Sequence, residues 1–212
     1  MNFFSNAIIH KVLLKLFNQK YLIVKERIEL ARLSKSNKKK IIVGAGSQPS
    51  KKNWVNTNKH TLNLLNADTW KKYFQMDSID NILAEHVWEH LTLEEGKKAV
   101  EVCYYFLKPG GKLRIAVPDG FHKSKSYIER VKPGGSGYGS DDHKVLYNYK
   151  TLSESLKESG FKVEKIEYFD ENHKFHFKDW SFEDGLVHRS RFDKRNKSGQ
   201  INYTSLIIDG IK

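Results

Sequence analysis

Three short apolar runs, each followed by small or polar residues, limit the fold of this chain more than any other sequence feature. The runs span residues 41–43, 79–84 and 112–117, and stretches of helical character separate them. Glycines follow the first run, Glu85 and His86 follow the second, and Asp119 follows the third. In an open parallel sheet wrapped by helices, ligands bind at the edge where the strands end. The sequence therefore predicts an α/β fold with a ligand site at that edge.

Capping and turn residues predict the remaining elements. Residues 91–107 are predicted to form a helix with Thr92 as its N-cap. Pro109 and Gly110 end that helix, because proline cannot continue the hydrogen-bond ladder and glycine supplies the turn. Thr151 is predicted to cap a second helix over residues 151–159. Further strands are predicted at residues 54–58, 161–168 and 203–209.

The chain of 212 residues is long enough for one large domain with a core of its own. A polar, charged linker at residues 34–40 separates a predicted helical arm, residues 1–37, from a domain that spans residues 38–212. Within that domain, residues 121–149 interrupt the alternation of strands and helices and include a glycine-rich stretch. Because long loops in compact domains are commonly lids or binding loops, we predict a lid or substrate loop there.

The N-terminal arm carries most of the excess charge. Residues 1–40 hold ten Lys and Arg against two Glu, in a chain whose formal net charge is +12. Apolar residues and lysines share the arm, which predicts one or two amphipathic helices at residues 8–17 and 21–33. Such helices can cap the domain with a solvated basic face, or dock on an anionic membrane surface or a phosphate-bearing substrate. Nucleic-acid binding is disfavoured, because arginine is scarce there and no recognition module is present.

The composition favours a cytoplasmic protein. No apolar run approaches the roughly 18 residues that a membrane span needs, and the lysines in the apolar stretch argue against a secretory signal. The one cysteine, Cys103, excludes an internal disulfide and fits a reducing compartment. Peripheral contact with the inner face of the membrane through the arm stays open. The oligomeric state cannot be inferred from the sequence.

The glycine loop that follows residue 43 does not identify its ligand alone. Gly44 and Gly46 lack side chains, so the backbone there can lie against a ligand. The third glycine of the dinucleotide fingerprint is missing, because Gln48 and Pro49 follow, and no Walker lysine is present. A nicotinamide enzyme and a P-loop protein are therefore both disfavoured.

Taken in order, the motifs over about residues 40–170 resemble those of the class I S-adenosylmethionine-dependent methyltransferases. The matching segments are Gly44-Ala45-Gly46-Ser47, Trp54-Val55-Asn56, Ala67-Asp68, Glu85-His86-Val87-Trp88-Glu89-His90-Leu91, Leu107-Lys108-Pro109-Gly110-Gly111 and Val117-Pro118-Asp119. The resemblance is closest to a bacterial subgroup of small predicted methyltransferases. It implies a Rossmann-like, doubly wound, mostly parallel seven-stranded sheet with an antiparallel last strand, preceded by the helical arm.

The resemblance also implies S-adenosyl-L-methionine as the cofactor and assigns roles to matched positions. The glycine loop would pass under the methionine moiety, Asn58 takes the position of a ribose-binding carboxylate, and Asp68 would lie beside the adenine. An alternative for Asp68 is the N-cap of a helix that begins at Thr69. The implied cofactor-binding residues are Gly44, Ala45, Gly46, Ser47, Asn58, Ala67, Asp68 and Glu85.

Methyl transfer from a sulfonium needs an acceptor held in line, and a base only when the acceptor is a hydroxyl or a protonated amine. His86 is the first candidate for that base. Asp119 and His143 follow as substrate-pocket residues. The expected acceptor is a small molecule or a glycan, with a phosphorylated carbohydrate included. Because Ile42 and Asn58 stand where acids are frequent in the family, a binding-only protein without catalysis stays open.

A zinc hydrolase is a further alternative, because His86, Glu89 and His90 form the His-x-x-Glu-His signature of zinc peptidases. Two histidines four residues apart on a helix can chelate zinc, and the glutamate between them could activate water. The segment, however, follows a predicted strand instead of lying within a long helix. We therefore expect no resident metal.

Overall fold

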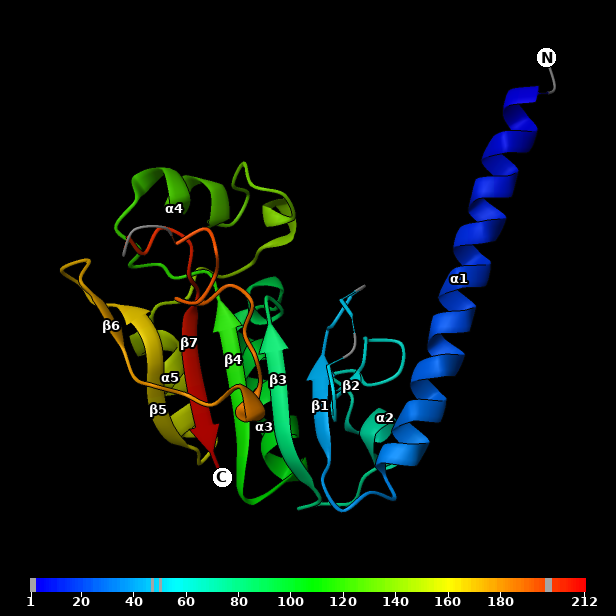
Figure 1. Cartoon of the computed structure of the whole chain (residues 1–212), viewed down its shortest axis with the longest axis horizontal. Helices are drawn as coiled ribbons and strands as arrows, with labels where there is room; N and C mark the ends of the chain where they lie inside the picture. Colours follow the sequence, from blue (N-terminus) through cyan, green and yellow to red (C-terminus); the bar gives the residue numbers. More distant parts are fainter. Residues whose placement is uncertain (1–2, 47, 50, 197–199) are drawn as a thin grey trace.

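The computed structural model describes residues 3–46, 48–49, 51–196 and 200–212, with side chains described from residue 17 onward. Within these residues, seven strands form one sheet in the order β2-β1-β3-β4-β7-β5-β6 (Figure 1). The helices and strands are α1 (Phe3–Leu33), β1 (Lys40–Val43), β2 (Val55–Asn56), α2 (Ala67–Lys71), β3 (Ile79–Glu85), α3 (Leu93–Phe106), β4 (Leu107–Val117), α4 (Lys125–Val131), α5 (Tyr149–Glu158), β5 (Lys162–Phe169), β6 (Phe175–Phe177) and β7 (Leu206–Ile211). Three 3₁₀ turns complete the described elements, at Trp88–His90, Ser140–Asp142 and Phe182–Asp184.

The sheet has the predicted Rossmann-like arrangement. β1 pairs in parallel with both β2 and β3, and β3 pairs in parallel with β4. The last strand, β7, is antiparallel to both of its neighbours, β4 and β5. The α/β fold class, the mostly parallel seven-stranded sheet, the antiparallel last strand and the N-terminal helix are therefore confirmed.

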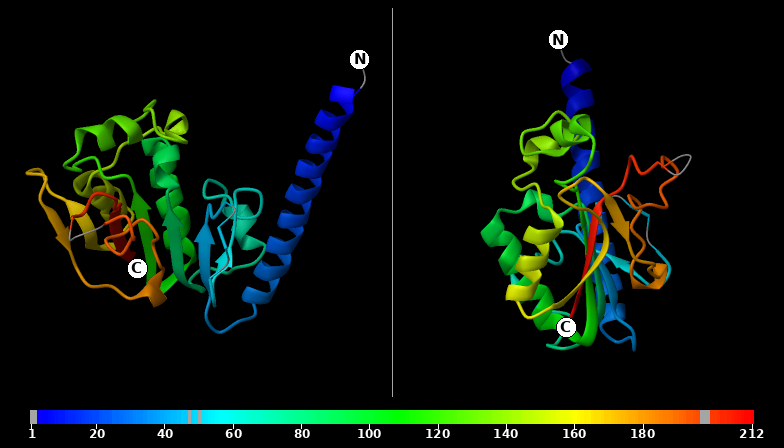
Figure 2. Two further views of the ribbon diagram at one scale, coloured as in Figure 1. Left: turned by 45° about the horizontal axis from the view of Figure 1, so that its top comes forward. Right: turned by 90° about the vertical axis from the view of Figure 1, so that its left-hand side faces the viewer.

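Helices and a long connection cover opposite faces of the sheet. Figure 2 shows α3 and α5 on one face and the connection between β6 and β7 on the other. Successive residues of β1 alternate between these faces, as a strand requires: Ile41 and Val43 join the large core under the helices, whereas Ile42 joins a smaller core. In the smaller core, Val187 and Trp180 pack from the long connection.

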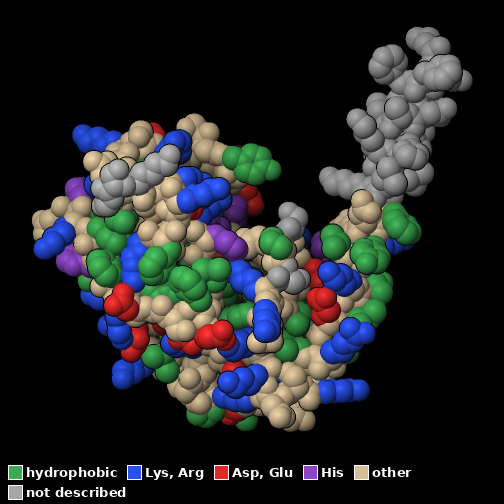
Figure 3. All heavy atoms as spheres, viewed as in Figure 1, with side chains coloured by type: hydrophobic (Ala, Val, Ile, Leu, Met, Phe, Trp, Pro, Cys, Tyr) green, Lys and Arg blue, Asp and Glu red, His purple; other side chains and the backbone are tan. Residues whose placement is uncertain are grey.

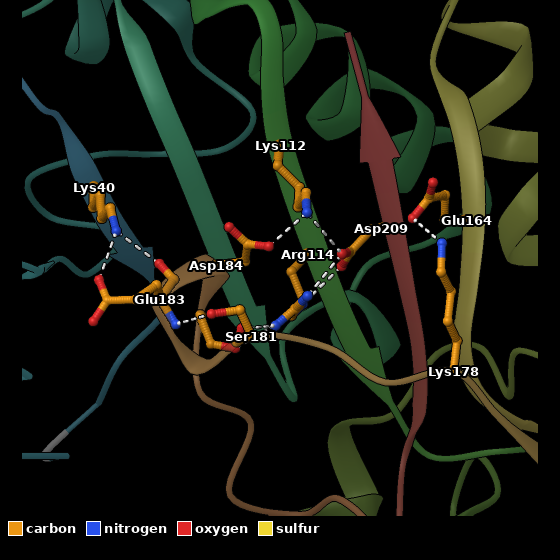
Figure 4. Close-up of polar contacts among 10 residues, drawn as sticks. Lys40, Lys112, Arg114, Glu164, Lys178, Ser181, Glu183, Asp184 and Asp209 are labelled. Carbon is orange, nitrogen blue, oxygen red and sulfur yellow. Dashed lines mark hydrogen bonds and ion pairs between the residues drawn. The ribbon is translucent and has the colours of Figure 1, made fainter.

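A buried ion pair joins β4 to β7 beneath that connection (Figure 4). Both nitrogen–oxygen distances between the Arg114 guanidinium and the Asp209 carboxylate are 2.7 Å. The side chains of Arg114 and Asp209 are 0% and 1% exposed. Arg114 also donates to the carbonyl of Gly185 at 2.7 Å, and its guanidinium lies 4.7 Å from the ring centroid of Trp180. One arginine therefore ties the long connection to the centre of the sheet.

The arm is one continuous helix, α1, of 31 residues. Figure 1 shows it at the β2 edge of the sheet, with its N-terminal half extending past the strand ends. Leu30 and Leu33 near its C-terminal end are buried in the large core. Several apolar side chains that precede them in α1 are exposed: Phe17, Tyr21, Leu22, Val24 and Ile28. The predicted amphipathic face over residues 8–16 lies outside the described side chains, and none of the described helices is both long enough and apolar enough to cross a membrane.

Several predicted boundaries need correction. The predicted N-cap Thr151 lies inside α5, and the helix begins earlier because the side chain of Asn148 accepts hydrogen bonds from the backbone N–H groups of residues 150 and 151. The predicted strand at residues 54–58 is reduced to Val55–Asn56. The predicted loop at residues 121–149 contains the helix α4, capped by Ser124. The short strand β6 was not predicted, because Phe175–Phe177 lies in a segment of mixed polar and aromatic residues.

We expect the substitution Asp209→Asn to lower the free energy of unfolding by about 3 kcal/mol or more, because it leaves the buried charge of Arg114 without its partner. The matched control is Glu164→Gln, which removes the ion pair between Glu164 and Lys178, whose side chains are 30% and 58% exposed. That change should cost less than about 1 kcal/mol. Urea denaturation of both variants measures the difference, and equal losses would contradict the role given to Arg114.

Candidate active site

The carboxyl ends of β1 and β3 lie side by side because the two strands pair in parallel, with Val43 opposite Ala84. The chain leaves β1 toward β2 on one side, while β3 and β4 lie on the other side. This is a topological switch point, where open α/β sheets form a crevice for ligands. The loop after β1 and the turn after β3 therefore border one crevice.

Gly44 and Gly46 shape the first side of this crevice. Both adopt left-handed backbone angles, with φ of +63° and +59°. A Cβ on Gly44 would lie 2.6 Å from a methyl carbon of Val87, which follows β3, whereas a Cβ on Gly46 would meet nothing within 4 Å. Gly44 thus lets the two loops pack together, and Gly46 leaves bare backbone facing open space.

A first cavity of about 700 Å³ opens beside these glycines. Figure 3 shows the surface hollowed between α1 and the loops at the strand ends. Five parts of the chain line the cavity: part of α1, the two glycines, the segment after β2, the turn after β3 and the 3₁₀ turn that contains Asp142. They are Gln19, Leu22, Ile23, Glu26, Gly44, Gly46, Asn58, Lys59, His60, Leu62, Asn63, Leu64, Leu65, His86, Val87, His90, Leu91 and Asp142.

Glu26 of α1 holds the wall of this cavity through Asn58. The Glu26 carboxylate accepts hydrogen bonds from the side-chain amide of Asn58 at 2.7 Å, from its backbone N–H at 3.1 Å and from the hydroxyl of Thr61. The Asn58 side-chain oxygen in turn accepts a hydrogen bond from the backbone N–H of Gly46 at 2.8 Å. Glu26 is 8% exposed, so a helix from outside the sheet brings a buried carboxylate to the predicted ribose position.

A second cavity of about 600 Å³ adjoins the first, since His86 and His90 line both. Figure 1 shows α4 and its following loop above the carboxyl end of β4 and the start of β7, and residues of this segment line the second cavity. The other lining residues come from the ends of β3 and β4 and from the segment before β7. The full set is His86, Glu89, His90, Pro118, Tyr127, Arg130, Val131, Gly137, Tyr138, Gly139, Ser140, His143, Arg189, Tyr203, Thr204 and Ser205.

His86 lies at the junction of the two cavities and is held on both sides. Its Nδ1 is 2.8 Å from a carboxylate oxygen of Glu89, and its Nε2 is 3.0 Å from the hydroxyl of Ser205. Its backbone is left-handed, with φ of +57°, which turns the chain sharply after β3. Burial raises the pKa of Glu89, but the charge of His86 and the hydrogen bond with it outweigh burial and hold that pKa below its usual value. The Glu89 carboxylate therefore orients the imidazole.

Two other predicted site residues, Glu85 and His143, lie in different surroundings. The Glu85 carboxylate turns to the opposite side, where it accepts hydrogen bonds from the backbone N–H of Arg189 at 2.9 Å and from His188 at 3.0 Å. It is 7% exposed and lines neither cavity. His143 lines the second cavity, and its Nδ1 lies 2.6 Å from the carbonyl of Val131.

Three of the predicted cofactor residues point away from the first cavity. Ala45 is 3% exposed and packs in the smaller core. Ala67 and Asp68 lie in α2, where the Asp68 carboxylate pairs with Lys71 and its side chain is 79% exposed. The N-cap alternative for Asp68 is wrong, because Asn66 caps α2. A fourth residue, Ser47, lies outside the described residues.

Asp119 is fully buried and fastens the loop after β4. Its two carboxylate oxygens accept hydrogen bonds from the backbone N–H groups of Phe121 at 2.9 Å and of Phe169 at 2.8 Å. Its side chain is 0% exposed and lines neither cavity. Burial raises the pKa of Asp119 to about 6, although the two backbone N–H groups favour its charged form.

The geometry required for a zinc peptidase is not present. His86 lies in the turn after β3, and Trp88–His90 forms a 3₁₀ turn instead of part of a long helix. His86 and His90 are therefore not placed one turn apart on an α-helix face. In a zinc peptidase the carboxylate of Glu89 would activate water, but here it faces the Nδ1 of His86.

Comparison with known proteins identifies the domain. Residues 28–115 match the family model described as a methyltransferase domain. These residues contain β1 to β3, most of β4 and both loops of the crevice. The match covers less than half of the chain and shows a methyltransferase domain there, in line with the predicted cofactor S-adenosyl-L-methionine. A search of curated proteins gives no match.

Solved structures of other methyltransferases are similar at low identity. An S-adenosylmethionine-dependent methyltransferase from Archaeoglobus fulgidus is 18% identical with a TM-score of 0.47, over 91% of this chain and 94% of that chain. A possible histamine N-methyltransferase from Thermotoga maritima is 13% identical with a TM-score of 0.47, over 94% of this chain and 96% of that chain. An S-adenosylmethionine-dependent methyltransferase from Mesorhizobium loti is 11% identical with a TM-score of 0.48, over 82% of this chain and 90% of that chain. Similarities this distant do not extend to substrates.

The sequence did not indicate several of the residues that line or support the two cavities. Glu26 lies 32 residues before Asn58, in a helix assigned to a separate arm, and no local pattern links the two. Arg130 lies in α4, within a segment that the sequence predicts as a loop, and the sequence predicts no site role for Arg189 or Ser205. Glu89 does lie in a sequence motif, the His-x-x-Glu-His signature, but that motif predicts a zinc peptidase and not methyl transfer.

We expect Asp119→Asn to destabilise the fold without weakening binding of S-adenosylhomocysteine, because an amide cannot accept from both backbone N–H groups. The loss in free energy of unfolding should be about 1–3 kcal/mol. Since the folded-state pKa of Asp119 exceeds the unfolded value of 3.8, its protonated form favours folding, and this contribution is lost as pH rises through about 6. The deficit of the variant should therefore be larger near pH 4 than near pH 7.

Chemical denaturation at both pH values and calorimetry with S-adenosylhomocysteine measure these quantities. Asp141→Asn, at an exposed aspartate, is the control. A stable Asp119→Asn variant that fails to bind the nucleoside would show that Asp119 acts in the site itself.

Proposed function

We propose that this methyltransferase binds its cofactor in the first cavity and methylates a hydroxyl or amine of a small, anionic, carbohydrate-type acceptor in the second. The observation that carries the proposal is His86, which lines both cavities and is held by Glu89. A base at the junction of two cavities can reach an acceptor atom while that atom faces the methyl group. Alignment of donor and acceptor supplies much of the rate enhancement in such a reaction.

In the first cavity, the loop at Gly44 and Gly46 would pass under the methionine part of the cofactor, because its backbone is uncovered there. The ribose would lie at Asn58, with the Glu26 carboxylate completing the polar wall. A carboxylate accepts two hydrogen bonds from a vicinal diol, and an amide alone does this less well. Leu64 and Leu65 line the same cavity and supply an apolar surface for the adenine.

His86 would act as the general base. Glu89 accepts the Nδ1 proton of the neutral imidazole, so the lone pair on Nε2 faces Ser205 and the second cavity. Nε2 would take the proton of the acceptor as the acceptor atom takes the methyl group. The cofactor would supply that methyl group and would leave as S-adenosylhomocysteine. Histidine suits this step because its ordinary pKa lies near neutral pH.

The charge of the second cavity supports an anionic acceptor. Arg130 from α4 and Arg189 from the segment before β7 both line it. Guanidinium groups bind carboxylates and phosphates in bidentate geometry. Tyr138 and Tyr203 border the same space and offer the flat surfaces on which sugar rings pack. A phosphorylated sugar or a sugar acid combines these features.

We propose further that residues 121–149 form the substrate segment and that α1 forms one wall of the cofactor cavity. Arg130, Val131, Tyr138 and Ser140 of the first segment line the second cavity. Leu22 and Glu26 of α1 line the first cavity. The division of the chain at residue 37, the cytoplasmic location and contact of the arm with an anionic membrane stay predictions.

We expect Glu26→Gln to weaken S-adenosylmethionine binding by about tenfold, equal to about 1.4 kcal/mol, because the ribose site loses its carboxylate. Glu29→Gln is the matched control: it lies one turn further along α1, and its pairing with Lys25 is loose, at 3.8 Å. Isothermal titration calorimetry compares the two. Equal affinities in both variants and the native protein would remove Glu26 from the cofactor site.

We expect His86→Asn to lower kcat by about 10²–10⁴-fold with little change in cofactor affinity, since asparagine tolerates the left-handed backbone but cannot act as a base. Formation of S-adenosylhomocysteine would be followed with sugar phosphates, sugar acids and neutral sugars. Anionic acceptors should react fastest, and Arg189→Gln should raise their KM. His176→Asn, on β6, is the control. Tight cofactor binding with no turnover of any acceptor would favour the binding-only alternative.

A further inference from the structure

Glu89, His90 and His143 bring three metal-ligating groups together at the boundary of the two cavities. One ligand atom from each lies within 4.8 Å of the other two. The rings of His90 and His143 meet edge to face, with centroids 4.9 Å apart. The backbone fixes this arrangement, because the Glu89 carbonyl accepts hydrogen bonds from the backbone N–H groups of Lys144 at 2.6 Å and Val145 at 3.3 Å.

Two buried atoms of this cluster lack a hydrogen-bond partner among the described residues. They are Oε2 of Glu89 and Nδ1 of His90. The Glu89 side chain is 1% exposed, and only its other oxygen is engaged, by His86. The Oδ2 atom of Asp142 lies 3.3 Å from Nδ1 of His90, but the two do not have hydrogen-bond geometry. An unpartnered anionic oxygen in a buried position is costly, and a cation beside it would remove that cost.

His143 is oriented as a metal ligand. Its Nδ1 donates to the carbonyl of Val131 at 2.6 Å, which leaves the lone pair on Nε2 free. A backbone carbonyl that fixes the tautomer of an imidazole in this way is the usual outer partner of a metal-bound histidine. The residue is half-buried and lines the second cavity.

We propose that Glu89, His90 and His143 bind one divalent transition-metal ion, with Zn²⁺ the best match, at the wall between the two cavities. Two imidazoles and one carboxylate form a donor set that suits such ions and leaves a coordination position open. Metal–ligand bonds there are about 2.0–2.2 Å, so the ligand atoms would close by about an ångström through side-chain rotation. This set differs from the zinc-peptidase triplet, because His143 replaces His86.

The open position would take an oxygen of the acceptor, and this part of the inference rests on the proposed function. The second cavity is also lined by Arg130 and Arg189, whose charges oppose a cation unless an anion is present. An acceptor that carries a carboxylate or phosphate satisfies both arginines and the ion. The ion would lower the pKa of a bound hydroxyl, while His86, held by the other oxygen of Glu89, takes its proton.

The test uses the full chain without a polyhistidine tag, stripped with a chelator and titrated with Zn²⁺ and with Co²⁺. Inductively coupled plasma mass spectrometry gives the bound metal, and visible absorption of Co²⁺ gives the coordination geometry. We expect about one ion per chain in the native protein. The Co²⁺ form should show the visible absorption of an ion with few ligands, bound through nitrogen and oxygen atoms. His143→Ala and Glu89→Gln should weaken binding by at least about tenfold.

His173→Asn is the matched control, since His173 lies outside the cluster and has a left-handed backbone that asparagine accepts. Thermal unfolding of each variant shows whether the fold is kept, and His143→Ala is the decisive variant because His143 is only half-buried. Equal metal binding by the native protein and His143→Ala would overturn the proposal. S-adenosylmethionine binding, measured on the metal-free protein, separates the two proposals. A protein that does not bind S-adenosylmethionine would contradict the proposed function without contradicting the metal site.

Discussion

The site of this methyltransferase depends on one constraint, the close packing of two loops where parallel strands β1 and β3 end together. Gly44 makes it possible, because any Cβ there would collide with Val87 and would also sit on a left-handed backbone. His86, which directly precedes Val87, is turned by its own left-handed angle into the space that remains. The crevice, its bare backbone and the histidine at its centre therefore follow from a single backbone arrangement.

Elements outside the parallel half of the sheet complete that crevice. The helix α1 contributes Glu26, which reaches Asn58 across the β2 edge and through it the backbone of Gly46. On the other side, α4 and the segment before β7 contribute arginines, and Ser205 stands against His86. The common core thus supplies the proposed cofactor cavity, and the added segments supply charge and polarity that the core lacks. Specificity for the acceptor would be decided in these added segments.

The parts of the structure that could be predicted are those governed by local chemistry. The strand ends and the Thr92 cap with its partner Glu95 follow from capping rules and backbone geometry. The parts that could not be predicted depend on contacts between distant segments. Asp119 has the sequence context of a site residue, yet it binds the backbone of Phe169, 50 residues away. Asp68 also fits the family pattern, but its side chain on α2 is exposed to solvent. No sequence pattern indicates the contact between Glu26 and Asn58.

A structure of the protein with S-adenosylhomocysteine bound tests the central claim most directly. The account predicts the homocysteine part against the backbone of Gly44 and Gly46, the ribose between Asn58 and Glu26, and the sulfur directed toward His86 and the second cavity. A nucleoside bound elsewhere, or bound with its sulfur turned away from His86, would contradict the account.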